Sequence, residues 1–535
     1  MKCPNCSGTL YFDIDSQKLK CTSCDSKFKA DEYEGADMAQ ESIIEGARLY
    51  TCQSCGAELI SANDEAVSFC SYCGSQAILE SRMEGVKRPK YIVPFRISKS
   101  QCKKIYEKEL INKLYVPKEF KDPDFIERFR PFYIPYWMYR VSFLKEPIKV
   151  KGHKSYTAGD YDYDEDYDVV VKLDDGAYGV PYDASRNFDD TIAEHIAPFS
   201  RKYLRNYHPG YLAGMYADSP NVDAKTYADE VIDKASRQAV TKLEESLGNI
   251  SLDLPSRPKK LREFLDAKYE GEETVYLPVW FLTWKKGDRV AYAVVNGQSG
   301  KIHIDLPADT NVFAVYTAIG AAILFVLLSL FVSVTSRFVI WFAALLVYLV
   351  GRRYHSELKQ IRNRENHVFD KGYLLSDEKE LPMPEKKRDR IRKWGVRSSN
   401  FLQKVLSGIG LSIVFLFFLF FGELYDLLVS QTGAIALTFV MLILETIVFF
   451  KQINAARYLK NKRSVLVALF GFGSVFYAFM VASLQPVEDW WYYLGAIICL
   501  CAASAMSIDL ILRYNETSTR PLPSFYSRKG GNDRA

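Results

Sequence analysis

The sequence predicts a multidomain α+β membrane protein with two tandem four-cysteine zinc ribbons, a mixed α/β soluble domain and a six-helix transmembrane region. Three observations lead to this fold class. Four Cys-x-x-Cys pairs lie within the first 73 residues. Residues 91–307 combine strand and helix patterns with polar turns. Long apolar runs occupy much of residues 312–512, so the overall 48% hydrophobic content averages over two different halves.

The cysteine pairs form two quartets that repeat one small unit. Fourteen residues separate the two pairs of each quartet, and every cysteine of the second quartet lies 49 positions after its counterpart in the first. Four thiolates at this spacing are typical of a zinc ribbon, a unit too small to fold without its metal. The expected ligands of two Zn2+ ions per chain are Cys3, Cys6, Cys21, Cys24, Cys52, Cys55, Cys70 and Cys73.

Other uses of these cysteines fit less well. A redox dithiol normally lies at a helix start beside a βαβ pattern, and neither quartet has that context. Disulfides form in oxidising compartments, whereas the chain opens without the apolar stretch of a secretory signal. We therefore expect zinc ribbons at residues 1–30 and 49–80, joined by an acidic linker at 31–48 that lets the ribbons move separately.

The residue after each cysteine pair is expected to turn tightly around sulfur, a position that suits glycine. Gly56 and Gly74 hold this position in the second ribbon, but Ser7 and Asp25 hold it in the first. The first ribbon is therefore expected to have a looser geometry than the second.

Residues 91–307 are expected to form a mixed α+β cytosolic domain. Helical periodicity with start or stop signals predicts helices at residues 100–114 and 223–247. Runs of β-branched and aromatic residues predict strands at 132–141, 169–171, 275–284 and 290–295. The last of these strands is followed by a hairpin turn at residues 296–301.

Two of the expected strands share a Pro-x-Trp core. It is Pro135 and Trp137 in one strand, and Pro278 and Trp280 in the other. This likeness suggests a second, fainter duplication. Because proline cannot donate a hydrogen bond to a neighbouring strand, both strands are expected at the margin of a sheet.

Residues 160–168 alternate tyrosine with carboxylates. The segment lacks the glycine and glutamate that an EF-hand calcium loop requires at its sixth and twelfth positions. It is instead expected to be an exposed strand with an acidic face. The basic residues expected opposite it are Lys145, Lys149, Lys151 and Lys154.

The apolar half predicts six membrane spans. Residues 312–350 contain only one charge, Arg337, and are too long for one helix across a ~30 Å hydrocarbon core, so two spans with a turn near residues 333–337 are expected. Four more spans are expected within 401–512, at about 401–421, 433–450, 465–484 and 491–512.

Loop charges predict the topology. Residues 351–400 carry fourteen Lys and Arg, while residues 451–463 and the tail at 513–535 carry five each. By the positive-inside rule these segments face the cytosol, which makes a multi-pass cell-membrane protein with both termini cytosolic. The basic loop at 351–400 is also expected to attract anionic membrane lipid, at ~1 kcal/mol per basic residue.

Glu445 and Asp509 lie inside predicted spans, where acids are functional candidates by default. Both lie near the predicted cytosolic ends, and Asp509 precedes Arg513 by four residues, so pairing and snorkelling are the simpler expectation. No His-Glu-x-x-His, Gly-x-Ser-x-Gly or phosphate-loop motif occurs. We therefore expect no catalytic residues and no cofactor besides zinc.

The chain resembles a known family in four places. These are the twin ribbons at 3–24 and 52–73, the strand at 91–97, the Tyr-Leu-Pro-Val-Trp motif at 276–280 and the turn at 296–301. The chain is similar there to the double zinc-ribbon (TFIIB-type) membrane proteins of Gram-positive bacteria. The resemblance implies zinc on the eight cysteines. Six spans, where that family usually has a pair, are a departure from it.

Some proteins of this kind are similar to partners of SPFH-domain and phage-shock scaffolds in envelope stress, which the resemblance makes candidate partners here. Others carry a primosomal helicase label, which the missing ATP-binding motif does not support. The leading hypothesis is a non-enzymatic adaptor that recruits cytosolic or membrane proteins to the bacterial inner membrane. The sequence leaves open whether the chain forms a homo-oligomer.

Two alternatives are kept. The first is a transporter or channel-like protein that depends on Glu445 or Asp509 and is regulated by the ribbons. The second is membrane-tethered nucleic-acid binding. It is disfavoured because the lysines lie on the first ribbon only, while the second has no basic residue between Cys52 and Cys73. The lysines concerned are Lys18, Lys20, Lys27 and Lys29.

Overall fold

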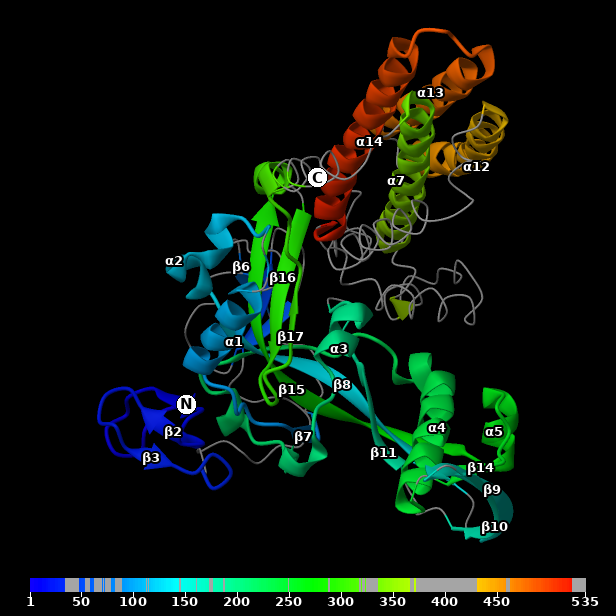
Figure 1. Ribbon diagram of the computed structural model, residues 1–535. Helices are drawn as coiled ribbons and strands as arrows, with labels where there is room; N and C mark the ends of the chain where they lie inside the picture. The colour runs from blue at the N-terminus through cyan, green and yellow to red at the C-terminus, as the bar shows by residue number, and fades with distance from the viewer. Residues whose placement is uncertain are drawn as a thin grey trace, which may run out of the picture.

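A helical bundle and a large β-sheet assembly make up the chain (Figure 1). The computed structural model describes residues 1–33, 48–52, 58–61, 70, 72, 78–81, 89–111, 113, 115–143, 146–159, 161–172, 177–185, 188–248, 250–286, 289–316, 319, 323, 335–365, 370–371, 431–458 and 462–521. The bundle lies at one end of the molecule, and the first ribbon lies at the other end of the sheet assembly (Figure 1).

The strands fall into three sheets within the described residues. They are β1 (Leu10–Asp13), β2 (Lys18–Cys21), β3 (Lys27–Phe28), β4 (Arg48–Cys52), β5 (Glu58–Ser61), β6 (Ile78–Ser81), β7 (Tyr91–Ile92), β8 (Arg130–Ser142), β9 (Ile148–Ala158), β10 (Tyr161–Val171), β11 (Ala177–Asp183), β12 (Arg205–Asn206), β13 (Tyr216–Asp218), β14 (Ser251–Leu252), β15 (Lys268–Lys286), β16 (Arg289–Asn296), β17 (Ile302–Ile304) and β18 (Arg520–Pro521).

The α-helices are α1 (Lys99–Ile111), α2 (Pro123–Ile126), α3 (Asp190–Ile196), α4 (Ala228–Ser246), α5 (Pro258–Phe264), α7 (Ser336–Glu365), α12 (Gln431–Tyr458), α13 (Lys462–Leu484) and α14 (Trp490–Thr517). Short 3-10 helices lie at Lys118–Lys121, Arg201–Tyr203, Pro209–Leu212 and Ala224–Tyr227. The predicted helices at 100–114 and 223–247, and the predicted strands of the soluble domain, are confirmed with shifted ends.

The long strands β8 and β15 form the centre of a 12-stranded mixed sheet. They pair antiparallel from Arg130 opposite Phe281 to Ser142 opposite Lys268. Both faces of this pair are buried, because alternate side chains belong to two separate cores. One core includes side chains of α1, and the other includes side chains of α3.

The expectation that proline places these strands at a sheet margin is wrong. Pro135 and Pro278 lie inside the central pair, and their carbonyls accept hydrogen bonds from Ala184 N and Gly297 N, each at 2.8 Å. In an antiparallel strand, the N–H and C=O groups of one residue point to the same side. The N–H that each proline lacks would therefore face away from the β8–β15 pairing, toward the strands on the other side. On that side Pro135 lies between the ladders of β13 and β11, and Pro278 lies between those of β7 and β16. Neither proline therefore interrupts a ladder.

The second duplication is visible as a repeated arrangement. When the elements between them are left aside, among them α2, β9 and β10 in the first half and β14 and α5 in the second, the order β7, α1, β8, β11 recurs as β13, α4, β15, β16. The two copies exchange their first strands, because β7 pairs parallel with β15 and β13 pairs parallel with β8. The soluble domain is thus an interlocked pair of similar units.

Matching hydrogen bonds extend the likeness between the copies. Trp280 Nε1 donates to Ile97 O at 2.7 Å, just before α1, and Trp137 Nε1 donates to Val222 O at 3.0 Å, just before the helical segment that contains α4. In the same way the carbonyl of Gly297 accepts from Arg96 N and Ile97 N, while that of Ala184 accepts from Asn221 N and Val222 N. Each tryptophan therefore ties its long strand to the helix of the other copy.

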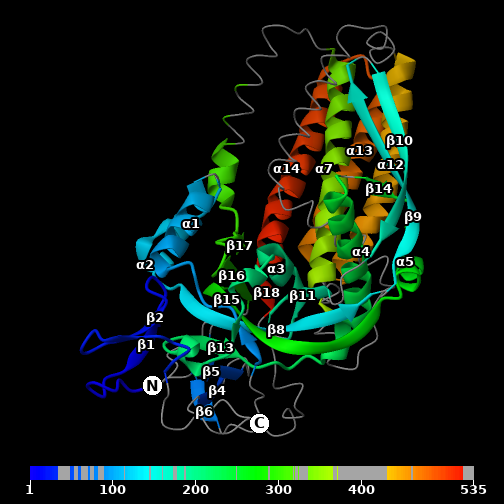
Figure 2. The same ribbon diagram turned by 90° about the horizontal axis from the view of Figure 1, so that it is seen from below.

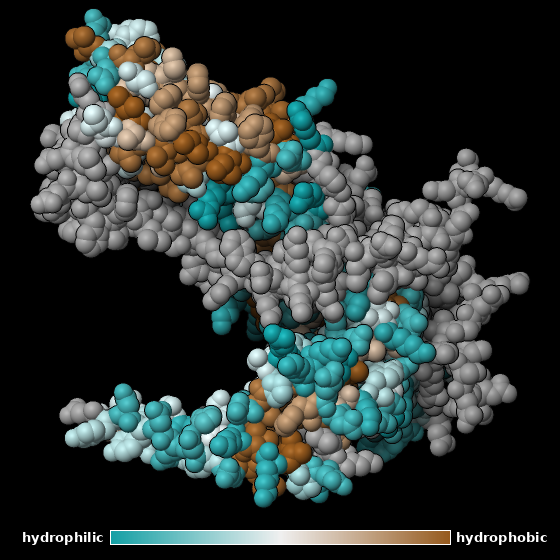
Figure 3. Space-filling view, turned by 90° about the vertical axis from the view of Figure 1, so that its right-hand side faces the viewer, coloured by the Kyte–Doolittle hydropathy of each residue, from teal (hydrophilic) through white to brown (hydrophobic). Residues whose placement is uncertain are grey.

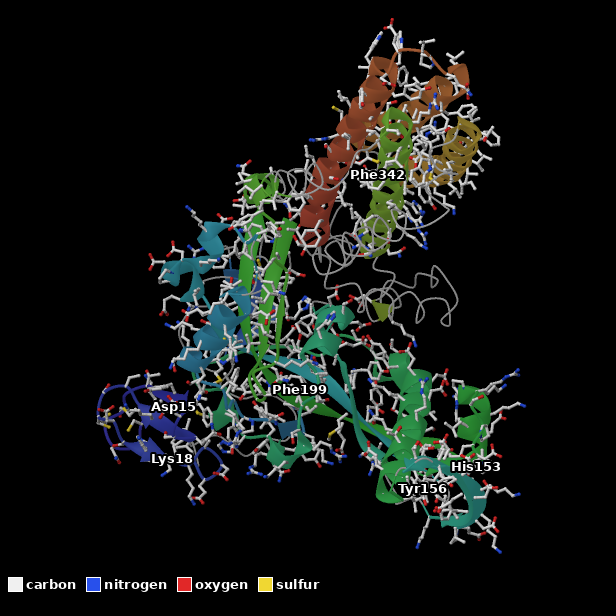
Figure 4. The ribbon with its side chains drawn as sticks, viewed as in Figure 1. Asp15, Lys18, His153, Tyr156, Phe199 and Phe342 are labelled. Carbon is white, nitrogen blue, oxygen red and sulfur yellow. The ribbon has the colours of Figure 1, made fainter. Side chains whose placement is uncertain are left out.

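The acidic segment forms an exposed hairpin, as predicted. Strand β10 pairs antiparallel with β9, with Asp168 opposite Lys151 and Glu165 opposite Lys154. His153 and Tyr156 of β9 lie at the end of the sheet assembly opposite the first ribbon (Figure 4). On the acidic face, Asp162 and Asp164 instead accept hydrogen bonds from Thr157 at 2.7 Å and Ser155 at 2.5 Å, so Lys151 is the only one of the expected lysines found opposite an acid of this face among the described residues. Lys149 is opposite Val170, and Lys145 lies outside the described residues.

Four helices among the described residues are long and apolar enough to cross a membrane: α7, α12, α13 and α14. Hydrophobic side chains cover much of this bundle, and hydrophilic ones gather at its end nearer the sheets (Figure 3). The last three helices match the predicted spans at 433–450, 465–484 and 491–512. The predicted span at 401–421 and most of the first half of 312–350 lie outside the described residues.

Helix α7 continues to Glu365, although the basic loop was expected from residue 351. Tyr354, Leu358 and Ile361 are buried, so one apolar stripe extends the helix beyond the hydrophobic run. The charges between them made this part of the sequence look like a loop.

The end of α14 is joined to the sheet. Strand β18 follows α14 directly and pairs with β16. Arg289 of β16 donates to Thr519 Oγ1 at 2.8 Å and to Glu516 O at 2.9 Å. Asn515 Nδ2 donates to Ala308 O at 2.9 Å. These contacts hold the C-terminal end of α14 and the start of the apolar region against the soluble domain, as Figure 2 also shows for β16, β18 and α14.

Candidate metal centre

The first cysteine quartet converges to one point. Its Sγ atoms all lie within 4.8 Å of one another, with Cys3 and Cys24 3.6 Å apart and Cys6 and Cys21 3.4 Å apart. Zn–S bonds of about 2.3 Å in a tetrahedron place the sulfurs roughly 3.8 Å apart. The four cysteines therefore fit a single tetrahedral metal ion.

Two knuckles hold the quartet, one before β1 and the other after β2. In the first knuckle, Cys3 N donates to Gly8 O at 2.7 Å and Ser7 N donates to Cys3 O at 2.8 Å. In the second, Ser23 N donates to Cys21 Sγ at 3.4 Å. Cys3 and Cys21 are buried, while Cys6 and Cys24 are exposed. The metal centre would thus be half embedded in the ribbon and half open to solvent.

Local hydrogen bonds favour thiolates on the second knuckle. The Ser26 hydroxyl and backbone lower the pKa of Cys24 to about 6. Backbone N–H groups of Cys24 and Ser23 lower the pKa of Cys21. A deprotonated thiol is the form that binds metal, so these donors prepare the knuckle for a cation.

The expected tight turns occur in the first ribbon without glycine. Ser7 and Asp25 have φ values of 56° and 55°, in the left-handed region that favours glycine. Such a conformation costs a non-glycine residue roughly 1 kcal/mol. The tight turn expected at this position is thus present in the first ribbon, and the departure from glycine is absorbed as local strain. The expectation that the first ribbon is looser than the second stays a prediction, because Gly56 and Gly74 lie outside the described residues.

Ser7→Gly is expected to stabilise the first ribbon by about 0.5–1 kcal/mol, because glycine adopts this φ without strain. Hydrogen exchange of residues 1–30 in the full chain measures the effect, with slower exchange expected. The control is Ser23→Gly, a serine for which the structure shows no positive φ. Equal or faster exchange in the Ser7 variant would contradict the strain argument.

The first ribbon packs against the soluble domain. Phe12 N donates to Ala213 O at 2.9 Å, and the rings of Phe12 and Tyr211 meet edge to face at 5.3 Å. Gln17 Nε2 donates to Phe95 O at 2.6 Å. Buried ribbon residues, including Leu10 and Cys21, share one hydrophobic core with the central sheet.

The described part of residues 48–81, the predicted second ribbon, belongs to the main sheet. Its strands β4, β5 and β6 pair with one another, and β5 continues the sheet by pairing with β13. Cys52 and Cys70 are fully buried. Cys55 and Cys73 lie outside the described residues. The structure therefore describes two of the four cysteines of the second quartet, and a metal site there stays a prediction.

Tyr72, between Cys70 and Cys73, fastens this ribbon to the core. Its hydroxyl donates to Asp218 Oδ2 at 2.6 Å across 146 residues of sequence, and burial raises its pKa well above the usual value. Ser185 Oγ donates to the same carboxylate oxygen, and Ser219 N donates to the other one at 2.9 Å. No local pattern in the chain marks this carboxylate, because its partners are far apart in sequence.

The described residues of both predicted ribbons therefore pack against the soluble domain, which does not fit the expectation that the ribbons move separately. Each has buried apolar side chains that the sequence could not assign to a partner, namely Phe12 in one and Tyr72 in the other. Burying these side chains against the sheet stabilises the docked position of each segment relative to an undocked, freely moving one. Most of the predicted linker, residues 34–47, lies outside the described residues.

Tyr72→Phe is expected to weaken the docking of the second ribbon by about 1.5–3 kcal/mol, the range for a hydrogen bond to a charged group. Faster hydrogen exchange in residues 48–81 measures it. Tyr106→Phe is the control for removing a buried hydroxyl, since Tyr106 is fully buried and its hydroxyl has no hydrogen-bond partner among the described residues. An equal effect of both substitutions would remove the special role of Asp218.

Acidic neighbours offset the basic edge of the first ribbon. Lys20 pairs with Asp25 at 3.0 Å, and Lys29 pairs with Glu32 at 2.5 Å. Lys18 is exposed beside Asp15 on the β1–β2 hairpin (Figure 4). Mixed charge of this kind does not form the continuous basic stripe that grips a phosphate backbone.

The two intramembrane acids have different surroundings. Asp509 is buried in α14 and pairs with Arg463 at 3.2 Å and Arg513 at 3.6 Å, as expected for the latter. Glu445 is buried in α12, and its two oxygens have no hydrogen-bond partner among the described residues. The expectation that Glu445 snorkels or pairs is therefore not met in this part of the chain.

Comparison with known proteins gives one similar chain. The protein described as "Uncharacterized protein YdjG" from Bacillus subtilis (strain 168) is 26% identical over 307 residues. The match covers 56% of this chain and 88% of that protein. No protein-family model and no solved structure matches the chain.

Proposed function

We propose that the protein is a non-enzymatic, membrane-anchored adaptor whose zinc ribbons and soluble domain recruit other proteins to the cytosolic face of the cell membrane. It would hold two Zn2+ ions, one on each cysteine quartet. The observation that carries the proposal is an unbroken series of contacts from the first ribbon through the sheet to the membrane bundle. The first ribbon shares a core with the sheet, and the sheet is bonded to the end of α14. A partner bound at a ribbon would thus be held at a fixed place relative to the bilayer.

The first ribbon is the more accessible contact surface. It projects from the sheet assembly at the end away from the bundle, and its outer knuckle cysteines are exposed (Figure 1). Its lysines are interleaved with acidic residues, which favours a protein partner of mixed charge over nucleic acid. Partners of the SPFH or phage-shock kind, which the resemblance implies, are the first to test.

Six membrane spans are part of this proposal, and helix directions support them. Ser336 Oγ at the start of α7 donates to Asp489 at 2.7 Å, next to the start of α14, whereas Ala308 is bonded to Asn515 at the far end of α14. Residues 308 and 336 therefore lie at opposite ends of the bundle. One predicted span, in the first part of 312–350, falls between them.

The interval between α7 and α12 also supports an additional span. Phe338 of α7 packs with Leu437 of α12, and further along both helices Tyr354 packs with Ala455. Helices α7 and α12 therefore run in the same direction, so the end of α7 and the start of α12 lie at opposite ends of the bundle. The predicted span at 401–421 lies in that interval. Together with the basic loops, this arrangement favours the sheets on the cytosolic side.

Affinity purification from membranes tests the adaptor function. Wild-type chain and the double variant Cys6→Ser/Cys24→Ser are compared with Cys501→Ser, an exposed cysteine on α14 that serves as the control for losing a thiol. We expect the first variant to remain in the membrane and to lose specific partners, while Cys501→Ser keeps them. A variant in which the cysteines of both quartets are changed to serine completes the test, and an unchanged set of partners in it would refute the adaptor function.

A further inference from the structure

Glu445 and Gln452 place unpaired acceptors in the interior of the bundle. Both side chains are fully buried on α12, two helical turns apart. Gln452 Nε2 donates to Gly351 O of α7 at 2.8 Å. Gln452 Oε1 and both oxygens of Glu445 have no hydrogen-bond partner among the described residues. Buried polar atoms are rarely left this way, so the group needs a physical explanation.

Two glycines create the space around the carboxylate. A Cβ atom on Gly351 of α7 would lie 3.3 and 3.4 Å from the Glu445 oxygens and 3.1 Å from Gln452 Nε2. On the other side, a Cβ atom on Gly471 of α13 would lie 3.7 Å from Glu445 Oε1 and would collide with Met506 of α14. The carboxyl group is thus enclosed by backbone and an apolar thioether.

The charged side chains near Glu445 either form ion pairs with other residues or are at least partly exposed. On α14 and α13, Arg513 and Arg463 pair with Asp509, and on α7 Arg353 pairs with Glu357 at 2.6 Å. The remaining titratable groups toward this end of the helices include exposed or half-buried side chains, namely Lys451 and Arg457 on α12, Lys462 on α13, and Arg352, His355, Lys359 and Arg362 on α7. None of these ion pairs reaches Glu445.

An ionised carboxylate buried without a partner costs several kcal/mol, so a proton is the simplest ion to neutralise it. We propose that Glu445 is a proton-binding site in the membrane bundle and that it exchanges its proton with the end of the bundle that faces the sheets. This site goes beyond the adaptor function and does not depend on it.

Buried polar side chains lie along the helices between Glu445 and that end of the bundle. Gln452 is the next buried polar group on α12, and it is bonded to α7 at Gly351. Tyr354 lies about one turn further along α7 and donates to Asp509 Oδ2 at 2.5 Å. Asp509 also accepts from Ser464 at 3.1 Å and pairs with Arg513, next to the junction with the sheet. Of these groups, the Tyr354 hydroxyl and the Asp509 carboxyl group are bonded to each other and can pass a proton between them.

Infrared spectroscopy of the full chain in lipid vesicles tests the proposal. Spectra of the wild type, Glu445→Gln and Asp509→Asn are recorded at a series of pH values and after a pH jump. We expect the wild type to show a protonated-carboxyl band that declines as pH rises and that is absent in Glu445→Gln. Asp509→Asn leaves Glu445 in place, so it should keep the Glu445 band but slow its response to the pH jump, because Asp509 lies between Glu445 and the end of the bundle that faces the sheets. Isotope-labelled glutamate assigns the band in wild-type protein without any substitution.

Thermal unfolding separates the two acids independently. Glu445→Gln is expected to leave the midpoint unchanged, whereas Asp509→Asn should lower it because Arg463 and Arg513 lose their partner. Identical infrared spectra of wild type and Glu445→Gln at every pH would overturn the proposal, since Glu445 would then be ionised. A band that does not respond to pH would also overturn it, because the proton would be fixed rather than exchanged.

Discussion

Replacing Cys6 and Cys24 by serine is expected to lower the zinc content from two ions to one per chain and to open residues 1–30. The metal supplies roughly 10–16 kcal/mol in small zinc-dependent peptides, and a ribbon of three short strands has little else to hold its knuckles. Elemental analysis of the purified full chain gives the metal content. Hydrogen exchange of residues 1–30 gives the loss of structure.

The remainder of the chain should keep its fold in this variant. The contact of Phe12 with Tyr211 anchors only the inner face of the first ribbon, and the central strands pair without it. Exchange in residues 130–142 and 268–286 should therefore stay slow. Cys501→Ser, outside both quartets, should retain two ions. An unchanged zinc content after the double substitution would show that this quartet is not a metal centre.

Trp280→Ala is expected to destabilise the soluble domain by about 3–5 kcal/mol, the cost of removing a buried aromatic side chain. Trp280 lies in the middle of the sheet, contacts Phe95 edge to face at 5.4 Å, and donates to Ile97 O at 2.7 Å. Its loss would leave a cavity beneath α1 and an unpaired carbonyl at the entry to that helix. Denaturant unfolding, followed by the exchange of residues 99–111, measures the change.

Two further variants separate packing from hydrogen bonding. Trp280→Phe keeps a ring but removes the indole donor, so a smaller loss of about 1–3 kcal/mol is expected. Trp137→Ala removes the equivalent side chain of the other copy, which is only half-buried, and should cost less than Trp280→Ala. Equal losses for all three would contradict the central role of Trp280.

Local features of the sequence were sufficient for the metal centre and for much of the secondary structure. Knuckle cysteines are close in the chain, so their spacing already indicates one convergent site, and Ser7 and Asp25 adopt the turn expected after each pair. The helices and spans follow from hydrophobic periodicity and length, which are also local properties. The Pro-x-Trp likeness correctly indicated a duplication.

Contacts between segments that are distant in the sequence could not be predicted from these local features. The prolines suggested a sheet margin because the sequence does not reveal where neighbouring strands end, yet Pro135 and Pro278 lie between ladders at the centre. The linker suggested mobile ribbons because the sequence does not reveal what Phe12 and Tyr72 pack against.

By itself, the sequence determined the cysteine quartet, the chief helices and strands, and an apolar region suited to a membrane. Only the tertiary structure decided that the two copies exchange strands, that Tyr72 meets Asp218, and that Asp509 is paired. It also left Glu445 without a partner among the described residues. The physical reason is that spacing and hydropathy act over a few residues, whereas the environment of a buried charge depends on which helices and strands pack around it.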